Sequence, residues 1–389
     1  MMRPIIQSMT DDDLYKFTMQ QVVFHQYPDV RAQFEFVCRN KDIKLGFLAK
    51  QITEEIENLG DLRLTDEEAQ QFLSMGFFRK DYVDFLRRFR YNQNLASFFE
   101  RNDGTLGGII EGTWLETILF EVKVLSIINE LYFRAKYPFD NLMEENGYER
   151  LRQKVQLLKP YPRFMLTDFG TRRRYSSEWH QSVVEYLSKN CLNCIGSSNV
   201  YLARKFNLKA MGTMAHEFIS AHLSISANIR ESQKRALFSW LQEYDNNLGI
   251  ALSDTFTSRA FFEDFGVTLS NGFTGVRHDS GDPIDFGWKV ISHYKKMGID
   301  PRTKMIVFSD GLNFPRAIEI FNTFAGLIGV SFGIGTNLSN DLGPEPINIV
   351  IKMVKCDNRY VVKLSDNLTK AIGDSAMIRK VKDVFGIGE

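Results

Sequence analysis

Residues 275–298, GVRHDSGDPIDFGWKVISHYKKMG, contain the pattern that decides the fold class. A short apolar run ends at Arg277 and a polar cluster follows it. A helix is predicted to begin after Asp282, because aspartate is a good N-cap and Pro283 suits the first helical position. The helix has an apolar stripe of Trp288, Ile291 and Tyr294 and is expected to end at Gly298. The stretch therefore predicts one unit of strand, polar loop and helix.

The same unit recurs along the chain from about residue 160. Four further polar clusters close strand-like runs: 167–174 (TDFGTRRR), 212–217 (GTMAHE), 309–312 (SDGL) and 333–336 (GIGT). The expected strands are 163–169, 194–195, a run ending at His216, 249–253, 275–277, 305–308 and 330–332. Strands that alternate with helices predict a parallel α/β sheet, closed or open. In such folds the chemistry lies at the carboxyl ends of the strands.

The first part of the chain lacks this alternation of strand and helix. Helices dominate it, with a strand expected at 32–37, and Thr65 begins a capping box. The acids 11–13 are expected in the first turn of a helix. The apolar segment 114–133 is predicted to be a buried helix between domains.

A chain of 389 residues favours two domains, and we place them at 1–135 and 136–389. The expected architecture is a smaller N-terminal α/β domain followed by the repeating α/β domain. Strand-like runs at 349–351 and 360–362 are expected to pack back on the N-terminal domain.

Composition bounds the class of protein. Lys+Arg and Asp+Glu number 48 each, so no global field favours nucleic acid or an anionic membrane. The N-terminus lacks the apolar core of a secretory signal, and no apolar run approaches membrane-spanning length. Four cysteines in so long a chain do not make a disulfide framework. These features predict a cytoplasmic protein.

The five clusters combine arginines, carboxylates, hydroxyls and glycines, a set that suits an anionic, phosphate-rich substrate. Arg277 can hold phosphate oxygens bidentately, and Asp279 and Asp282 can hold ribose hydroxyls or Mg²⁺ through water. The alternative is structural: Asp282 caps the helix and Arg277 pairs with Asp279. Capping accounts for Asp282 but leaves the rest of the cluster unexplained.

The cluster 333–336 can turn backbone N–H groups toward a phosphate, or it can be an ordinary turn. Leu338 stands where a dinucleotide fingerprint requires its third glycine, which disfavours a dinucleotide-binding fold. The absence of a lysine from the clusters argues against a Schiff-base aldolase.

His216 has two readings as well. A lone histidine at a strand end is often a satisfied core residue, but its position level with the other clusters favours catalysis. His216 and Glu217 do not complete a zinc-protease motif, since Ser220 stands where the second histidine belongs. A zinc site at the single pair Cys191 and Cys194 is disfavoured because the other cysteines are scattered. Phe169, inside a polar cluster, is placed to face a planar ring.

The motifs together resemble those of bacterial nicotinate phosphoribosyltransferases over essentially the whole chain. The shared stretches are 10–16 (TDDDLYK), 168–173 (DFGTRR), 212–217, 277–282 and 333–336. The resemblance implies an irregular TIM-like α/β barrel of the type II phosphoribosyltransferases, joined to a smaller α/β domain. It implies synthesis of nicotinate mononucleotide from nicotinate and phosphoribosyl pyrophosphate in NAD biosynthesis. It also implies coupling to ATP hydrolysis through a phosphohistidine, with Mg²⁺, in homodimers with shared active sites.

The resemblance also implies roles for individual residues. The catalytic set is His216 as the phosphohistidine, Asp279 at the ribose, and Glu217. Phe169 and Tyr15 would stack on the two faces of the pyridine ring, with Tyr15 coming from a second subunit, and Arg172 would read the ring substituent. The phosphoribosyl substrate would be bound by Arg277, Ser309, Asp310, Gly311, Gly333, Gly335 and Thr336. The metal ligands stay unassigned.

Ser198 bears on the choice between acid and amide. In the related nicotinamide enzymes an aspartate occupies the matching place, where a carboxylate would repel that of nicotinate. A neutral serine beside Arg172 therefore favours the acid. Two alternatives stay open: a nicotinamide phosphoribosyltransferase, and a catalytically silent barrel that serves as a binding scaffold. A silent barrel would be free to lose His216 or the Arg277 cluster, and both are intact.

Overall fold

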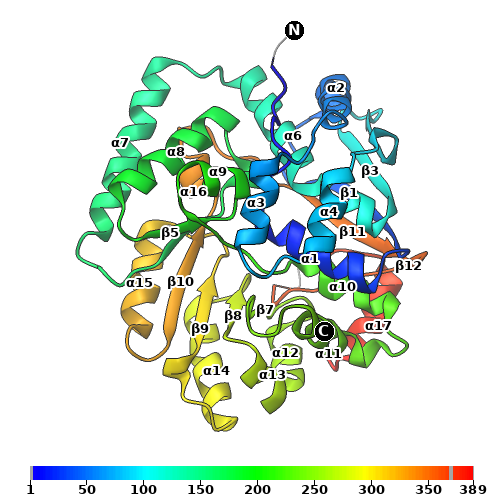
Figure 1. Cartoon of the computed structure of the whole chain (residues 1–389), viewed down its shortest axis with the longest axis vertical. Coiled ribbons are helices and arrows are strands. Elements are labelled where there is room, and N and C mark those ends of the chain that lie inside the picture. The colour runs from blue at the N-terminus through cyan, green and yellow to red at the C-terminus, as the bar shows by residue number, and fades with distance from the viewer. Residues whose placement is uncertain (1–2, 368–370, 389) are drawn as a thin grey trace.

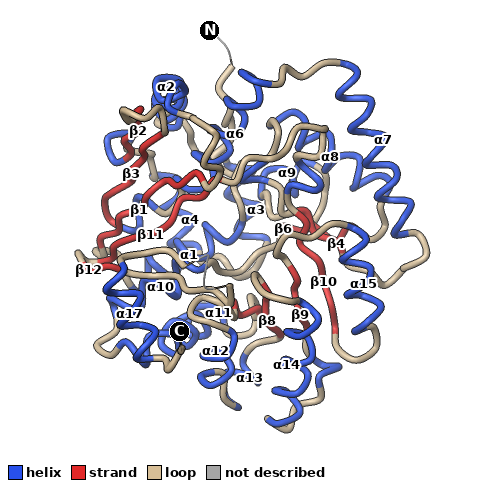
Figure 2. Tube along the Cα trace, turned by 180° about the vertical axis from the view of Figure 1, so that it is seen from behind, coloured by secondary structure: helices blue, strands red, loops and turns tan. Residues whose placement is uncertain are grey.

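Two β-sheets organise the chain, one parallel and one antiparallel (Figures 1 and 2). The structure is a computed structural model and describes residues 3–367 and 371–388. The parallel sheet has seven strands in the order β6-β5-β4-β10-β9-β8-β7. Its strands are β4 (Leu166–Asp168), β5 (Cys194–Ser197), β6 (Lys209–Ala210), β7 (Ile250–Leu252), β8 (Gly275–His278), β9 (Met305–Phe308) and β10 (Gly329–Ile334).

The parallel sheet curls into an irregular barrel, as the resemblance predicts. The strands follow chain order around the ring, with β4 between β5 and β10. Among the described residues β6 and β7 form no ladder with each other, so the ring has one open position, which we call the seam. Thr213 crosses the seam, because its Oγ1 donates to the carbonyl of Ile250 in β7 at 2.9 Å.

Helices connect the strands and cover the barrel (Figure 1). They are α8 (Ser177–Asn190), α9 (Val200–Lys205), α10 (His216–Ile225), α11 (Ser232–Tyr244), α12 (Ser258–Asp264), α13 (Val267–Gly272), α14 (Pro283–Lys296), α15 (Phe314–Phe324) and α16 (Thr336–Ser339). α14 begins as predicted, with Asp282 Oδ1 accepting from the amides of Ile284 and Asp285 at 2.9 Å. Trp288 lies at the edge of its apolar stripe and is 48% exposed.

His216 does not end a strand, and this part of the prediction was wrong. β6 stops at Ala210, a loop of five residues follows, and His216 is the first residue of α10. The loop leaves the sheet after Met211, whose amide still donates to Ser197 O at 2.9 Å. Thr213 then takes the loop across the seam, so the histidine reaches the strand-end level from a helix start.

The antiparallel sheet combines strands from the first and the last third of the chain. Its order is β12-β11-β1-β3-β2, with β1 (Arg31–Cys38), β2 (Ala96–Glu100), β3 (Leu106–Thr113), β11 (Ile349–Cys356) and β12 (Arg359–Tyr360). β11 pairs antiparallel with β1, with Phe36 opposite Ile351. The strands after residue 347 thus lie in the sheet of the N-terminal part, on the left in Figure 2.

The remaining helices surround this sheet or join it to the barrel. They are α1 (Leu14–Gln26), α2 (Ala49–Leu59), α3 (Asp66–Ser74), α4 (Lys80–Arg88), α5 (Trp114–Thr117), α6 (Phe120–Lys136), α7 (Asn141–Leu158) and α17 (Ser375–Val384). The predicted capping box is present at the start of α3, at Thr65 and Glu68. The apolar segment 114–133 divides into α5 and α6. α6 packs against β11 on one side and against the loop after β4 on the other, so it is buried between the two sheets.

The three N-terminal acids are not in the first turn of α1, contrary to our expectation. They precede the helix and are buried. Asp11 forms a two-bond ion pair with Arg174, at 2.7 and 2.8 Å. Asp12 accepts from Lys123 Nζ of α6 at 2.6 Å. Distant cations, rather than the helix dipole, compensate these carboxylates.

Candidate active site

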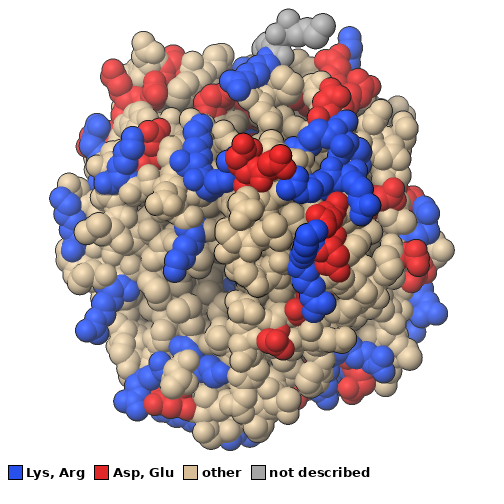
Figure 3. Space-filling view, viewed as in Figure 1, with Lys and Arg blue, Asp and Glu red and all other residues tan. Residues whose placement is uncertain are grey.

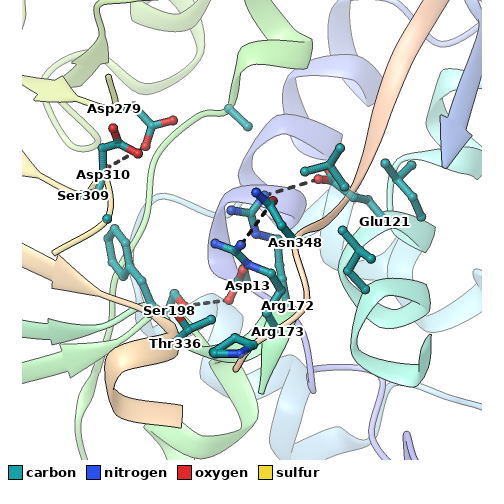
Figure 4. Close-up of a pocket in the computed structure, with 18 of the residues that line it drawn as sticks. Asp13, Glu121, Arg172, Arg173, Ser198, Asp279, Ser309, Asp310, Thr336 and Asn348 are labelled. Carbon is teal, nitrogen blue, oxygen red and sulfur yellow. Dashed lines mark hydrogen bonds and ion pairs between the residues drawn. The ribbon is translucent and has the colours of Figure 1, made fainter. Parts of the chain in front are cut away.

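A cavity of about 540 Å³ opens at the carboxyl ends of the barrel strands (Figure 4). The loops after β4, β8, β9 and β10 form one side of it, and α1 and β11 form the other. Of the predicted site residues, those that line it are Tyr15, Phe169, Arg172, Ser198, His216, Glu217, Arg277, Asp279, Ser309, Asp310, Gly311, Gly335 and Thr336. The fold therefore brings the five clusters together, as expected from their strand-end positions.

Gly333 is the predicted site residue that lies outside the lining. A Cβ at this position would lie 2.3 Å from the Phe169 ring. The ring therefore packs directly on the bare Cα of Gly333 in β10. The sequence pattern suggested a phosphate cradle at 333–336, and this role of Gly333 stays a prediction. What the structure shows is that a residue without a Cβ makes room for Phe169.

A buried network holds the loop that carries Phe169. Asp168 Oδ2 accepts from Ser197 Oγ at 2.6 Å and lies 2.9 Å from His180 Nε2. Its other oxygen accepts from the amide of Gly170 at 2.9 Å. Burial alone would raise the pKa of Asp168, but His180 and these donors lower it below the usual value. The ionised carboxylate fixes the backbone on both sides of Phe169.

His216 lies at the edge of the cavity with partners on both ring nitrogens. Nδ1 is 3.0 Å from Thr255 Oγ1, and Nε2 is 2.9 Å from Asp279 Oδ2 and 2.7 Å from Lys363 Nζ. Burial, reinforced by the charge of Lys363, lowers the pKa of His216 to about 4. The imidazole is therefore neutral at physiological pH and has a lone pair available on one nitrogen.

Asp279 joins His216 to the loops after β8 and β9. Its Oδ1 accepts from Ser309 Oγ at 2.9 Å and lies 3.6 Å from Arg277 Nη2. Although burial raises the pKa of Asp279, Arg277 and His216 hold it well below its usual range. Arg277 donates from Nη1 to Met214 O at 3.2 Å, whereas its buried Nε has no partner among the described residues. The structural reading of this cluster is confirmed, since Asp282 caps α14 and Arg277 lies beside Asp279. Arg277 and Asp279 also line the cavity, and their binding of phosphate or ribose stays a prediction.

Arg172 comes from the turn after β4 and lies across the cavity from Asp279, next to Glu121 at the start of α6 (Figure 4). Its Nη1 is 3.6 Å from Glu121 Oε1, and its side chain is 38% exposed, which leaves the guanidinium accessible to a ligand. Tyr15 also lines this cavity, from α1 of the same chain. Tyr15 lines its own chain's cavity, since the amide of Leu14 donates to Ser198 O after β5 at 2.8 Å. A contribution of Tyr15 from a second subunit stays a prediction.

Ser198 has a neighbour that the sequence analysis missed. Its Oγ donates to Asp13 Oδ1 at 2.6 Å, and Asp13 also lines the cavity. Burial raises the pKa of Asp13, against the opposing effect of the Ser198 hydrogen bond. An acidic side chain is therefore already present beside Ser198, and the argument from a neutral serine did not take it into account.

Glu217 is turned toward the core side of the cavity. Its carboxylate forms an ion pair with Lys16 and accepts from Trp114 Nε1 at 3.0 Å. Burial raises the pKa of Glu217 despite the lysine. These contacts hold α10 against α1 and α5.

Four cations in the cavity were assigned no role by the sequence analysis. Arg39 follows β1, Arg173 follows Arg172, Lys352 is in β11, and Lys363 follows β12. Burial and the neighbouring Arg172 and Arg39 lower the pKa of Arg173 to about 10. Burial also lowers the pKa of Lys352 to about 8. Mutually repelling cations in one cavity favour anionic ligands.

The positive charge is local to the cavity. On the face shown in Figure 3, basic and acidic side chains are interspersed, in keeping with the net charge of zero. Of the four cations, Arg173 belongs to the cluster 167–174 that the sequence analysis described. The others lie in or after strands of the other sheet, so the strand-end pattern of the barrel carried no signal for them.

The fold and the cavity define an α/β-barrel enzyme with an anion-binding pocket at its strand ends. Two family models match the sequence: the nicotinate phosphoribosyltransferase (NAPRTase) family over residues 164–389, and the N-terminal domain of the same family over residues 10–129. The chain belongs to the nicotinate phosphoribosyltransferase family. In the part of the chain that the structure describes, no helix has the length and apolarity needed to cross a membrane.

Individual relatives agree with the family models. The chain is 42% identical to nicotinate phosphoribosyltransferase of Acinetobacter baylyi over 401 residues, covering 100% of this chain and 98% of the relative. It is 44% identical to that of Cupriavidus necator over 390 residues, covering 98% and 99%. Crystal structures of the enzymes from Vibrio cholerae and Porphyromonas gingivalis superpose with TM-scores of 0.94 and 0.93, at 37% and 36% identity. They cover 99% and 98% of this chain, and 94% and 100% of their own.

Proposed function

We propose that this chain joins nicotinate to phosphoribosyl pyrophosphate, forming nicotinate mononucleotide and pyrophosphate, and couples the reaction to ATP hydrolysis. The observation that carries the proposal is the placement of a neutral, buried His216 in one cavity with Phe169, Tyr15 and Arg172. The imidazole of His216 can accept a phosphoryl group. The two aromatic rings and the guanidinium of Arg172 suit a planar ring that bears a carboxylate.

In the transfer step the ring nitrogen of nicotinate forms a bond to C1 of the ribose with its lone pair. The bond from C1 to the diphosphate oxygen breaks, and the electron pair leaves with pyrophosphate. Positive charge grows on the ribose, where the ionised Asp279 can stabilise it, and negative charge grows on the leaving group, facing Arg277 and the other cations. Positioning and fixed charges contribute most to such a step.

In the coupling step a nitrogen of His216 attacks the γ-phosphorus of ATP, and the bond to the β-phosphate oxygen breaks to release ADP. Water later takes the phosphoryl group from the histidine as inorganic phosphate. Lys363, at 2.7 Å from Nε2, is placed to offset the charge of the phosphoryl group. The lowered pKa of His216 favours the step because a protonated imidazole has no free lone pair.

Mg²⁺ is part of the proposal, and the donor set near His216 fits it. Ligand atoms of His216, Asp254 and Asp279 lie within 4.8 Å of one another, and the buried Asp254 Oδ1 has no hydrogen-bond partner among the described residues. Carboxylate oxygens are the ligands that Mg²⁺ prefers. Asp254 and Asp279 would hold the ion, which would supply charge neutralisation to the phosphates when bound.

The cellular setting is proposed from composition and resemblance. We place the enzyme in the cytoplasm, where NAD precursors are salvaged, as a homodimer with shared active sites. Light scattering on the purified protein tests the dimer. Because Tyr15 occupies its own chain's cavity, a monomer of full activity would remove the shared-site part of the proposal and leave the chemistry intact.

The test of the function is product analysis with nicotinate or nicotinamide, phosphoribosyl pyrophosphate and Mg²⁺, with and without ATP. We expect nicotinate mononucleotide, formed faster with ATP. Equal turnover of nicotinamide would favour the nicotinamide enzyme instead. ATP labelled in its γ-phosphate should leave an acid-labile phosphate on the wild type and none on His216→Ala, which should retain only slow ATP-independent synthesis. A scaffold protein would acquire no label, and undiminished ATP hydrolysis by His216→Ala would exclude the phosphohistidine.

A further inference from the structure

Four charged side chains form a continuous ion-pair network from Arg172, which is partly exposed, through three buried residues to the helix of His216. Arg172 Nη1 lies 3.6 Å from Glu121 Oε1, and the other oxygen of Glu121 lies 2.6 Å from Lys16 Nζ. Lys16 forms a second ion pair with Glu217, the residue after His216. Lys16 is fully buried, and the two carboxylates are nearly so. These ion pairs link the side of the cavity with Arg172 to the side with His216.

We propose that Lys16 is a positioning residue that couples occupancy of the Arg172 site to the placement of His216. The inference rests on the proposed function, since it concerns how ATP use and nicotinate binding affect each other. Lys16 touches neither substrate in this scheme and acts through Glu121 and Glu217.

The helix that carries Lys16 contacts both places. Tyr15, one residue before it, lines the cavity beside Arg172. Further along α1, Thr18 Oγ1 donates to Thr213 O at 2.6 Å, and Met19 Sδ accepts from the amide of Ala215 at 3.3 Å. Residues 213 and 215 belong to the loop that leads into His216. A shift of α1 therefore reaches the ring side and the histidine side together.

The pKa values of Glu121 and Glu217 indicate how this ion-pair network would respond to a ligand. Two buried carboxylates share one lysine. Burial raises the pKa of both, but Lys16, Lys352 and Arg172 together bring the pKa of Glu121 down to about 2, whereas that of Glu217 stays raised. Glu121 thus has three cations near it, two of them in ion-pair contact, whereas Lys16 is the cation that lowers the pKa of Glu217.

A carboxylate bound at Arg172 competes with Glu121 for that guanidinium. Glu121 then depends more on Lys16, and the ion pair between Lys16 and Glu217 weakens at the start of α10. The reverse also holds, because coupling between two binding sites is reciprocal. A phosphoryl group on His216 that displaces Glu217 frees Lys16 for Glu121 and releases Arg172 for the ligand.

The test compares a charge-balanced double variant with a matched control. Lys16→Met alone would leave two buried carboxylates and endanger folding. Lys16→Met with Glu217→Gln removes one charge of each sign and leaves Glu121 paired with Arg172. Lys123→Met with Asp12→Asn removes another fully buried lysine–carboxylate pair, which links α6 to the same N-terminal segment but has no contact with α10 among the described residues. Lys16→Arg keeps the charge.

The readout is the factor by which ATP lowers the KM for nicotinate, measured with the unfolding midpoint in urea. In the Lys16 and Glu217 double variant we expect this factor to be smaller than in the wild type by about fivefold or more. The control should keep it within about twofold, although both lose stability. Lys16→Arg should retain most of the effect.

Two results overturn the inference in distinguishable ways. An unchanged ATP effect in the Lys16 and Glu217 double variant, with a normal effect in the wild type, removes the role of Lys16 and leaves the proposed function standing. An equal loss in the control pair does the same, because it assigns the effect to general destabilisation. Absence of any ATP effect in the wild type removes the proposed coupling itself, and the inference with it.

Discussion

Ser198 tests the charge balance at the ring side of the cavity. Its hydroxyl donates to Asp13 at 2.6 Å, so Ser198→Asp would place two buried carboxylates side by side. Such a pair holds one proton more tightly than an isolated acid. At low pH the pair keeps the net charge of the wild type, and at high pH it carries one more negative charge.

We therefore expect a pH-dependent penalty for Ser198→Asp. The KM for nicotinate should rise by about tenfold, equivalent to about 1.4 kcal/mol, above about pH 8, and by less near about pH 6. Ser198→Ala is the control, because it removes the hydrogen bond without adding charge. A pH-independent increase shared by both variants would mean that the hydrogen bond, and not the charge, sets the affinity.

His216 also predicts a pH dependence of stability. Its pKa in the folded protein is about 4, below the value near 6.5 in an unfolded chain. A depressed pKa contributes stability above the unfolded value, and that stability is lost as pH falls toward the folded one. At about pH 5 the loss is about 2 kcal/mol.

Urea unfolding at about pH 7.5 and about pH 5 measures this contribution. The difference between the two unfolding free energies should be smaller by about 2 kcal/mol in His216→Asn than in the wild type. His222, whose pKa burial also lowers to about 4, acts as an internal comparison. His222→Asn should flatten the profile similarly without affecting phosphorylation. An identical profile for wild type and His216→Asn would contradict the buried, neutral state.

At this scale the sequence predicted the residues that end barrel strands, because parallel strands bring their carboxyl ends to one edge. It could not predict Lys363, which lies about 150 residues from His216 in sequence yet 2.7 Å from its ring. Nor could it show that Asp13 lies against Ser198. Both contacts depend on how the two sheets meet, and no local pattern encodes that.

Among the elements, β10 has a specific function in shaping the ring site. The bare Cα of Gly333 supports the Phe169 ring, and a Cβ there would lie 2.3 Å from it. Gly333→Ala should therefore push Phe169 from its position, at a cost of about 1–3 kcal/mol in overpacking or in lost ring binding. We expect a raised KM for nicotinate with a smaller change for phosphoribosyl pyrophosphate.

The matched control for Gly333→Ala is Ser331→Ala in the same strand, since Ser331 has only a long 3.4 Å hydrogen bond to Met165 O. Steady-state kinetics with each substrate varied in turn separate the two effects. Equal changes in both Michaelis constants would show that the whole strand has shifted rather than Phe169 alone.

The elements also show where local patterns mislead. The acids 11–13 looked like first-turn residues because acids near a helix start usually serve its dipole. Here Asp11 and Asp12 form ion pairs with the buried cations Arg174 and Lys123, which lie far along the chain. The start of α14, by contrast, was predicted correctly since its capping contacts lie within three residues.

A strand from before the barrel and a strand from after it pair in one sheet. β11 lies next to β1 in the antiparallel sheet, although about 310 residues separate them. Large chains often unfold domain by domain. This one should unfold in a single transition, because the N-terminal sheet needs a strand that follows the barrel in sequence.

Far-ultraviolet circular dichroism and tryptophan fluorescence in urea test this expectation. Trp114 reports on α5 near the N-terminal sheet, and Trp240 reports on α11 of the barrel. The transitions of the wild type and of single-tryptophan variants should coincide. Separated transitions for Trp114 and Trp240 would indicate two independently stable parts.

At this largest scale the sequence predicted two α/β parts and the return of the C-terminal strands, because alternating apolar runs and capped helices are visible in one chain. The boundary at 135 stays a prediction. The seam between β6 and β7 was not predictable, since the residues that cross it form no regular element.

The seam gives the barrel wall one mechanically compliant sector. Elsewhere a displacement of the wall must break a ladder of strand hydrogen bonds, whereas the loop before α10 is joined to β7 by the side chain of Thr213, and α10 is joined to α1 by the ion pair of Glu217 with Lys16. Side-chain contacts rearrange at lower cost than a ladder. His216, which we propose to alternate between a free and a phosphorylated form, thus stands where the scaffold yields most easily, and the rigid remainder keeps the sugar and ring subsites in register while it does so.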